Sequence, residues 1–91
     1  MLYIVSYDIP DTPRRTRLSE LLKDFGRRVH YSVFECLLAD GELDEMLGRI
    51  ADVVDGGEDS VRVYGVCASC ERRLVIIGRG DRTVDEKHYI L

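Results

Sequence analysis

The sequence lacks a long hydrophobic run. Its first apolar stretch, residues 2–5, is too short to span a bilayer or to form the core of a secretion signal, and no basic segment precedes it. Low-complexity segments and internal repeats with a period of about 20–50 residues are also lacking, which excludes repeat architectures. We therefore expect one domain spanning residues 1–91, located in the cytoplasm and with no membrane partner.

Cysteine is scarce and odd in number. Three cysteines do not form the even disulfide framework that is typical of small secreted domains. Cys67 and Cys70 make a single C-x-x-C motif, whereas a zinc site of paired motifs needs a second one at the right spacing. The motif falls on an expected connection between strands rather than at a helix start, where a redox motif has its thiolate stabilised. We expect inert thiols in a tight turn, unless a dimer brings two such pairs together.

The charge of the chain is unevenly distributed. The net charge is −4, yet residues 14–28 carry six basic side chains against two acidic ones, a net charge of +4. Residues 40–59 carry eight acidic side chains against one arginine, a net charge of −7. A low isoelectric point therefore does not exclude nucleic-acid binding, because the positive charge is local. The alternative is that each run is only the solvated face of a helix.

Hydrophobic periodicity predicts an alternation of strands and helices. The first strand, residues 2–7, is apolar on both faces, which is typical of a central strand. We expect Thr12 to cap a helix that has Pro13 in its first position and ends near Gly26. The other expected elements are strand structure at 28–39 with a bend, bulge or tight reversal near Tyr31 and Ser32, a helix between Asp40 and Gly57, strands at 60–67 and 73–78, and an extended apolar tail at 87–91.

This order of elements predicts an α+β fold of the ferredoxin-like type, β-α-β-β-α-β with an extra C-terminal strand. Both helices would cover one face of an antiparallel sheet. The apolar tail at 87–91 has no evident role within one protomer. We therefore expect a symmetric homodimer with strand exchange, in which residues from about 80 to 91 pair with the partner. The alternative is a tail that packs on its own sheet.

Asp8 directly follows the first strand and is a candidate site residue. Side chains at strand ends are held rigidly and remain open to solvent. Mg²⁺ often takes one or two carboxylates together with water and phosphate oxygens, and a two-fold axis would supply a second Asp8. The alternative from spacing alone is that Asp8 or Asp11 caps the turn before the helix.

Arginines follow Asp8 closely, at positions 14, 15 and 17. Arginine binds phosphate through paired hydrogen bonds, and a cluster gives sequence-independent affinity for a nucleic-acid backbone. Tyr7, Tyr31 and Phe34 lie near in the sequence and are candidates for stacking on bases. The alternative is that Tyr31 and Phe34 belong to the core and that the arginines are a solvated helix end.

Two segments carry a resemblance to a known family. Tyr7-Asp8-Ile9 ends the first strand, and Arg28-Val29-His30-Tyr31-Ser32-Val33-Phe34-Glu35 follows the arginine-bearing helix. In order, length and strand pattern, nearly the whole chain resembles the second CRISPR-associated protein family, the small partner of the CRISPR integrase. The resemblance implies a ferredoxin-like homodimer in which Asp8 lies near the two-fold axis and is a Mg²⁺ ligand and catalytic residue.

The resemblance also implies a function and a set of binding residues. The dimer would bind nucleic acid (a DNA protospacer, single-stranded RNA or both), bridge the CRISPR integrase during spacer acquisition and act as a metal-dependent endonuclease. The alternative is a stand-alone toxin-like ribonuclease of the virulence-associated D type. His30 departs from the family, which commonly has glutamine there. The positions linked to substrate binding are Arg15, Arg17, Arg28, Ser32 and Phe34.

Overall fold

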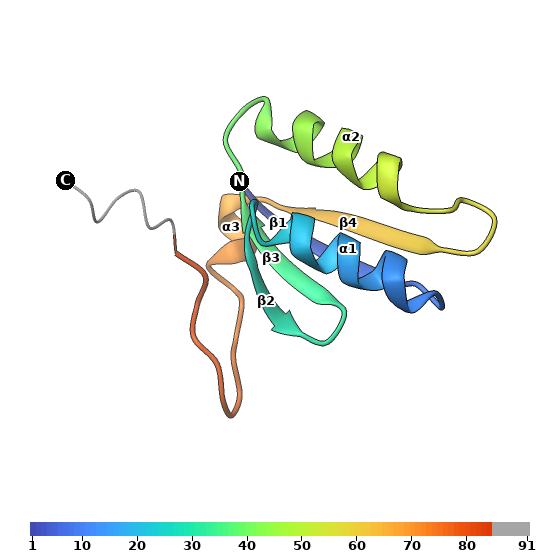
Figure 1. Ribbon diagram of the computed structural model, residues 1–91. Helices are drawn as coiled ribbons and strands as arrows, with labels where there is room; N and C mark the ends of the chain where they lie inside the picture. The colour runs from blue at the N-terminus through green and yellow to red at the C-terminus, as the bar shows by residue number, and fades with distance from the viewer. Residues whose placement is uncertain (85–91) are drawn as a thin grey trace.

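The computed structural model describes residues 1–84, which form one antiparallel sheet, two long helices and a short third helix (Figure 1). The sheet has the strand order β2-β3-β1-β4. This order, with two helices on one face, is the ferredoxin-like arrangement predicted from the sequence. The elements are β1 (Leu2–Asp8), α1 (Thr12–Leu22), β2 (Arg27–His30), β3 (Val33–Leu37), α2 (Glu42–Val53), β4 (Ser60–Val66) and α3 (Ala68–Glu71).

Strand β1 lies in the interior of the sheet, as its apolar sequence predicts. It pairs antiparallel with β3 on one side and with β4 on the other. Val5 and Tyr7 are buried against the helices. Ile4 lies on the opposite face, between Glu35 of β3 and Tyr64 of β4. The alternation of side chains therefore places Asp8, four residues after Ile4, on the face that α1 and α2 leave uncovered.

Helix α1 begins one residue earlier than predicted. The Oδ2 atom of Asp11 accepts a hydrogen bond from the backbone N–H of Arg14 at 3.0 Å, so Asp11 rather than Thr12 is the cap. Pro13 lies in the first turn, where its missing N–H costs no hydrogen bond. The helix ends at Leu22, before the predicted stop near Gly26.

The segment predicted to bend near Tyr31 forms a tight hairpin. Strands β2 and β3 pair antiparallel, and Tyr31 and Ser32 make the turn between them. A register shift lies between Arg28 and His30, so the short β2 is irregular as well as exposed. This hairpin brings its turn to the end of the sheet where β1 ends.

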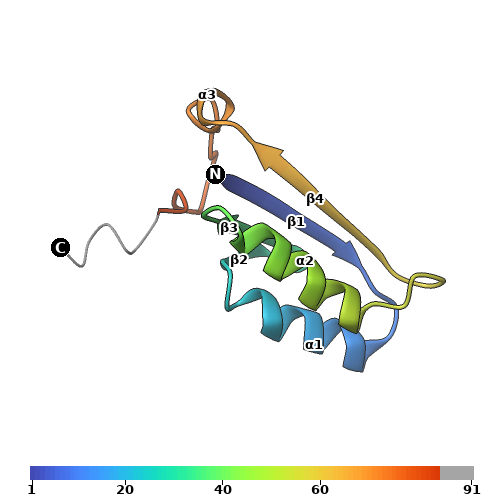
Figure 2. The same cartoon turned by 90° about the horizontal axis from the view of Figure 1, so that it is seen from above.

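Helices α1 and α2 lie side by side on the same face of the sheet (Figure 2). The buried cluster between them and the sheet includes Leu18, Phe34, Met46 and Ile50. Leu47 was expected in the apolar face of the second helix, but 40% of it is exposed. Met46 and Ile50 lie at the centre of the buried stripe of α2, and Leu47 lies at its margin.

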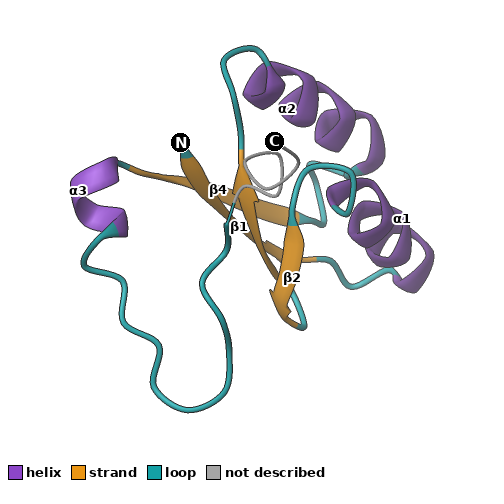
Figure 3. Cartoon of the chain, turned by 90° about the vertical axis from the view of Figure 1, so that its left-hand side faces the viewer, coloured by secondary structure: helices purple, strands orange, loops and turns teal. Residues whose placement is uncertain are grey.

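The chain after β4 differs from the sequence prediction. The expected connection at 67–72 contains a helical turn, α3, and no strand forms at 73–78 among the described residues. Figure 3 shows α3 and the segment after it on the opposite side of the sheet from α1 and α2. Apolar side chains of this segment remain exposed, with 93% of Ile77 open to solvent. A strand is stabilised by pairing with a neighbouring edge, and residues 73–78 have no such pairing here.

The predicted tail at 87–91 lies outside the described residues, and so does most of the segment expected to pair with a partner. Within residues 1–84, no helix has the length and apolar character needed to cross a membrane.

Candidate functional site

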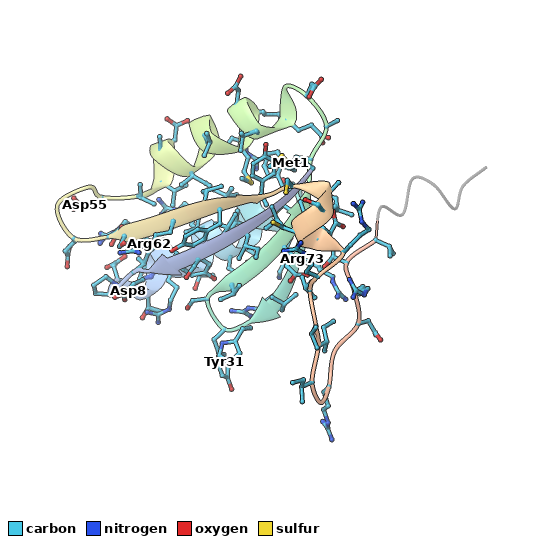
Figure 4. The ribbon with its side chains drawn as sticks, turned by 180° about the vertical axis from the view of Figure 1, so that it is seen from behind. Met1, Asp8, Tyr31, Asp55, Arg62 and Arg73 are labelled. Atoms are coloured by element: carbon cyan, nitrogen blue, oxygen red, sulfur yellow. The ribbon has the colours of Figure 1, made fainter. Side chains whose placement is uncertain are left out.

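Asp8 is the last residue of β1 and is exposed. Its backbone pairs opposite Ser60, the first residue of β4. Figure 4 shows Asp8 at the end of the sheet far from Met1, with Arg62 on the neighbouring strand. The sequence prediction of an exposed carboxylate at a rigid strand end therefore agrees with its position, and the capping role falls to Asp11 instead.

Arg15 fixes the turn that follows Asp8. Its Nη1 atom donates to the backbone oxygen of Ile9 at 2.9 Å, and its Nη2 atom donates to Thr12 Oγ1 at 3.0 Å. Two hydrogen bonds from one planar guanidinium hold the entry to α1 against the end of β1. Arg15 thus positions the backbone beside Asp8, while Arg17 is exposed on the next turn of the helix.

Arg14 is occupied by acidic residues of the protein itself. Its Nε and Nη2 atoms bind the two carboxylate oxygens of Asp59 at 2.9 and 3.1 Å, and Nη2 also lies 3.1 Å from Glu58 Oε2. The Asp59 side chain is 0% exposed. The hydrogen bonds from Arg14 hold the pKa of Asp59 below its ordinary value. The cationic cluster expected from the sequence is therefore smaller, because Arg14 is neutralised.

Arg28 and the hairpin turn lie at the same end of the sheet. The Nη2 atom of Arg28 donates to the backbone oxygen of Tyr31 at 2.9 Å. The backbone N–H of Tyr7 donates to the oxygen of Ser32 at 3.1 Å, which ties the turn to the residue before Asp8. Arg28 also lines a cavity of about 510 Å³ between β2 and residues 74–81, together with Arg79. The structure thus places Ser32 beside β1, whereas Arg28 contacts the same turn from β2, which β3 separates from β1.

Of the three aromatic residues considered for base stacking, only Tyr31 is available. It is 81% exposed at the tip of the hairpin (Figure 4), with its ring edge-on to His30. Phe34 is fully buried, and Tyr7 is buried beside it with ring centroids 6.5 Å apart. The expectation that Phe34 contacts nucleic acid is therefore corrected: its ring packs against the helices and supports the strand from within.

Arg62 belongs to this region although the sequence analysis did not single it out. It is exposed on β4 and pairs opposite Ser6, two residues before Asp8 and on the same face of the sheet. The period-two alternation of residues 60–66 places Arg62 and Tyr64 on one face, but only the register with β1 shows which face that is. A cation and a carboxylate are thereby presented together on the uncovered face.

The donor set of one chain offers little to a metal ion. Among residues 1–84, no group of three or more histidine, cysteine, aspartate or glutamate side chains is placed to hold one. The exposed carboxylate of Asp8 is the kind of oxygen ligand that Mg²⁺ prefers, and this ion commonly completes its shell with water and phosphate oxygens. Asp8 is therefore compatible with Mg²⁺ as a single ligand, and the other ligands of such an ion would come from outside residues 1–84, such as water or phosphate oxygens.

Comparison with protein-family models gives a match over residues 1–74, and the matching family is described as CRISPR associated protein Cas2. The chain belongs to the Cas2 family. The matched residues include β1 through α3 and therefore all the candidate site residues. Membership of this family argues against the stand-alone toxin-like alternative.

Individual relatives agree with this assignment. The CRISPR-associated endoribonuclease Cas2 3 of Chloroflexus aurantiacus is 40% identical over 91 residues, covering 100% of this chain and 98% of the relative. The crystal structure of Streptococcus pyogenes Cas2 is similar with a TM-score of 0.74 and 31% identity, covering 86% of this chain and 100% of that one. A chain in a partial Cas6-RT-Cas1–Cas2 complex is similar with a TM-score of 0.66 and 25% identity, covering 84% and 89% of the two chains.

Proposed function

We propose that this protein is a subunit of the CRISPR adaptation machinery that forms a homodimer, binds a nucleic-acid backbone, bridges the CRISPR integrase and cleaves phosphodiester bonds with Mg²⁺ at Asp8. The observation that carries the proposal is the membership of the Cas2 family together with the exposed carboxylate at the end of its central strand. The relative in Chloroflexus aurantiacus is named an endoribonuclease, which supports nuclease activity.

A homodimer is supported by the uncovered face of the sheet. Helices α1 and α2 cover only one face, and apolar side chains such as Ile4, Val33 and Tyr64 share the other face with Asp8. A second copy placed on this face would remove apolar surface from water. A two-fold axis near Asp8 would then place a second carboxylate beside the first.

Backbone binding is supported by the exposed arginines. Arg62 is exposed on β4 opposite Ser6, and Arg17 and Arg28 are exposed on α1 and β2. Their guanidinium groups bind phosphate oxygens without regard to base sequence. Tyr31 offers an exposed ring for stacking on an unpaired base, which suits single-stranded RNA.

Asp8 gives the proposed reaction its anionic ligand. Bound Mg²⁺ would polarise a phosphoryl oxygen and lower the pKa of water, which are the contributions of the metal. Asp8 holds its carboxylate at a fixed place because β1 is paired on both sides, and Arg15 keeps the following turn in position. The exposed arginines would orient the scissile phosphate toward Asp8.

An integrase partner is supported by one of the similar structures, because that chain is part of a complex named for Cas1 and Cas2. In the bridging role, the protein would hold the DNA through its backbone while the partner carries out integration. Binding of this kind does not require Asp8, so bridging and cleavage are separable functions of the same dimer.

The deciding experiment measures cleavage of end-labelled single-stranded RNA and double-stranded DNA by repurified protein, with Mg²⁺ or with EDTA. The variant Asp8→Asn keeps the size of the side chain and removes the charge, so cleavage should fall about 100-fold or more. Binding of the same substrates, measured by fluorescence anisotropy without Mg²⁺, should remain close to that of the wild type.

The matched control is Asp52→Asn, which removes an exposed carboxylate from α2, on the other side of the sheet. This variant should cleave as the wild type does. Equal cleavage by Asp8→Asn, or cleavage that persists in EDTA, would remove Asp8 from the reaction and leave the bridging role alone.

A further inference from the structure

The C-x-x-C motif lies at the start of the helical turn α3, whereas the sequence predicted only a connection between strands there. Cys67 is the residue directly before α3, and the backbone N–H of Glu71 donates to the oxygen of Cys67 at 2.8 Å, which closes the first turn. Cys67 has the extended backbone of a cap residue, which directs its side chain toward the turn that contains Cys70. A disulfide needs Cβ atoms about 3.5–4.5 Å apart, so the two cysteines join by an adjustment of the backbone at the cap.

The two thiols of the motif are accessible and chemically unequal. Both are exposed, and Cys67 Sγ lies 3.2 Å from the hydroxyl oxygen of Ser69. Hydrogen bonds from Ser69 and Cys70 lower the pKa of Cys67 to about 7, and the neighbouring Cys67 sulfur raises the pKa of Cys70. An exposed thiol whose pKa lies near neutral pH is close to the optimum for attack on a disulfide.

Cys36 provides an internal contrast. It is buried in β3, and burial raises its pKa to about 11. A buried thiol without a stabilised thiolate does not react with disulfides in solution. The chain therefore contains an exposed pair of thiols and a buried thiol, which can be compared under identical conditions.

We propose that Cys67 and Cys70 form a dithiol–disulfide site that reacts with low-molecular-weight disulfides such as oxidised glutathione. The thiolate of Cys67 attacks one sulfur of the oxidant, forms a mixed disulfide and releases the first glutathione thiolate. The thiol of Cys70 then loses its proton and attacks Cys67 Sγ, forming the intramolecular disulfide and releasing the second. Two protein thiols are oxidised and one external disulfide is reduced to two thiols.

The site is separate from the proposed nuclease centre. Cys67 follows Val66, which pairs opposite Leu2 at one end of β1, whereas Asp8 lies at the other end. The disulfide would lie in the turn that directly precedes residues 73–84. In this turn the backbone N–H of Arg73 donates to the backbone oxygen of Cys70 at 3.0 Å. Oxidation therefore acts on the junction after β4, independently of any reaction at Asp8.

The test uses the full-length, fully reduced protein incubated with oxidised glutathione at pH 7, followed by intact-mass measurement and peptide mapping. We expect the wild type to lose two hydrogen atoms and to yield one disulfide, between Cys67 and Cys70. Cys36 should become alkylated only after denaturation. The variant Cys70→Ser should stop at a glutathione adduct on Cys67, because the second thiol is missing.

Rates separate the attacking thiol from the second one. Cys67→Ser should react about threefold more slowly than Cys70→Ser at pH 7. The thiol that remains in Cys67→Ser is mostly protonated at this pH, and the larger thiolate fraction of Cys67 outweighs its lower intrinsic nucleophilicity. The rate for Cys70→Ser should rise with pH through an inflection near 7 and then reach a plateau. Ser69→Ala should move this inflection to higher pH, because it removes a hydrogen bond to the thiolate.

Three outcomes would overturn the proposal. The first is glutathione adducts on both thiols without an internal disulfide, which would mean that the turn cannot close. The second is equal reaction rates for the two single variants. The third is purified protein that contains zinc, measured by atomic emission, and whose two thiols react with oxidised glutathione only after a chelator is added. This result would make the motif part of a metal site between copies.

Discussion

At the scale of single residues, the structure gives different roles to the three arginines at positions 14, 15 and 17. Arg14 is paired with Asp59, Arg15 braces the turn after Asp8, and Arg17 is exposed. The sequence could predict the cluster but not this division, because Asp59 lies 45 positions from Arg14. Only the exposed member remains free for a phosphate.

The pairing of Arg14 with Asp59 predicts a pH-dependent contribution to stability. The folded pKa of Asp59 is depressed, so its contribution is present above the unfolded pKa of about 4 and is lost as the pH falls through the folded pKa. Asp59→Asn should therefore be less stable than the wild type at pH 7, and the difference should shrink below about pH 4. Urea unfolding followed by circular dichroism at several pH values measures this difference.

Asp52→Asn, which alters an exposed carboxylate on α2, serves as the control and should show little difference at any pH. A constant difference between wild type and Asp59→Asn from pH 7 to pH 2.5 (about 1.5 units below the unfolded pKa) would mean that the ionised carboxylate is not what stabilises the fold.

At the scale of elements, local sequence patterns placed most helices and strands correctly. The exceptions are the elements whose formation depends on distant contacts. The segment at 73–78 has a strand-like sequence but pairs with no edge among residues 1–84. Gly26, expected only to end the first helix, has a tertiary role: a Cβ atom there would lie 2.2 Å from the backbone oxygen of Glu35.

The tight contact at Gly26 predicts opposite effects of one substitution at two glycines. Gly26→Ala should reduce the free energy of unfolding by about 1–3 kcal/mol, because the neighbouring backbone of β3 must move. Gly48→Ala, within α2 and with no atom within 4 Å of the added methyl group, should increase it by about 1 kcal/mol through helix propensity. Denaturant unfolding of both variants would contradict this account if Gly26→Ala were as stable as the wild type.

At the scale of the whole molecule, one face of the sheet is covered by α1 and α2 and the other is largely open. The open face combines apolar side chains with the candidate site residues Asp8 and Arg62. At the candidate site one chain supplies the carboxylate of Asp8, and residues 1–84 contain no group of three or more histidine, cysteine, aspartate or glutamate side chains placed to hold a metal. The proposed dimer would cover the apolar surface of the open face, and it would place a second Asp8 carboxylate near the first.

The open face predicts a dimer that a single charge can disrupt. Sedimentation should give twice the chain mass of 10.4 kDa for the wild type. Tyr64→Glu should shift the protein to monomer, because it buries a charge against apolar surface on association. Leu47→Glu is the matched control, since Leu47 is 40% exposed on α2 and Tyr64 is 48% exposed on β4. A monomeric wild type, or a dimeric Tyr64→Glu, would contradict this prediction.

The sequence by itself determined the local architecture of this protein. The apolar run at 2–7 required a central strand, and the long strand segment reversed near Tyr31, as expected from its length. The position of Asp8 at a strand end followed from adjacent residues, and the resemblance to its family followed from two short segments in their order along the chain. Such features depend on neighbours in the chain, so periodicity and short motifs are sufficient to predict them.

Only the tertiary structure decided which side chains are free to act. It neutralised Arg14 with Asp59, buried Phe34 in the core and placed Arg62 on the same face as Asp8. It also turned the residues around Cys67 into a helix start. The physical reason is that burial, strand register and ion pairing depend on contacts between distant segments, which no local pattern records.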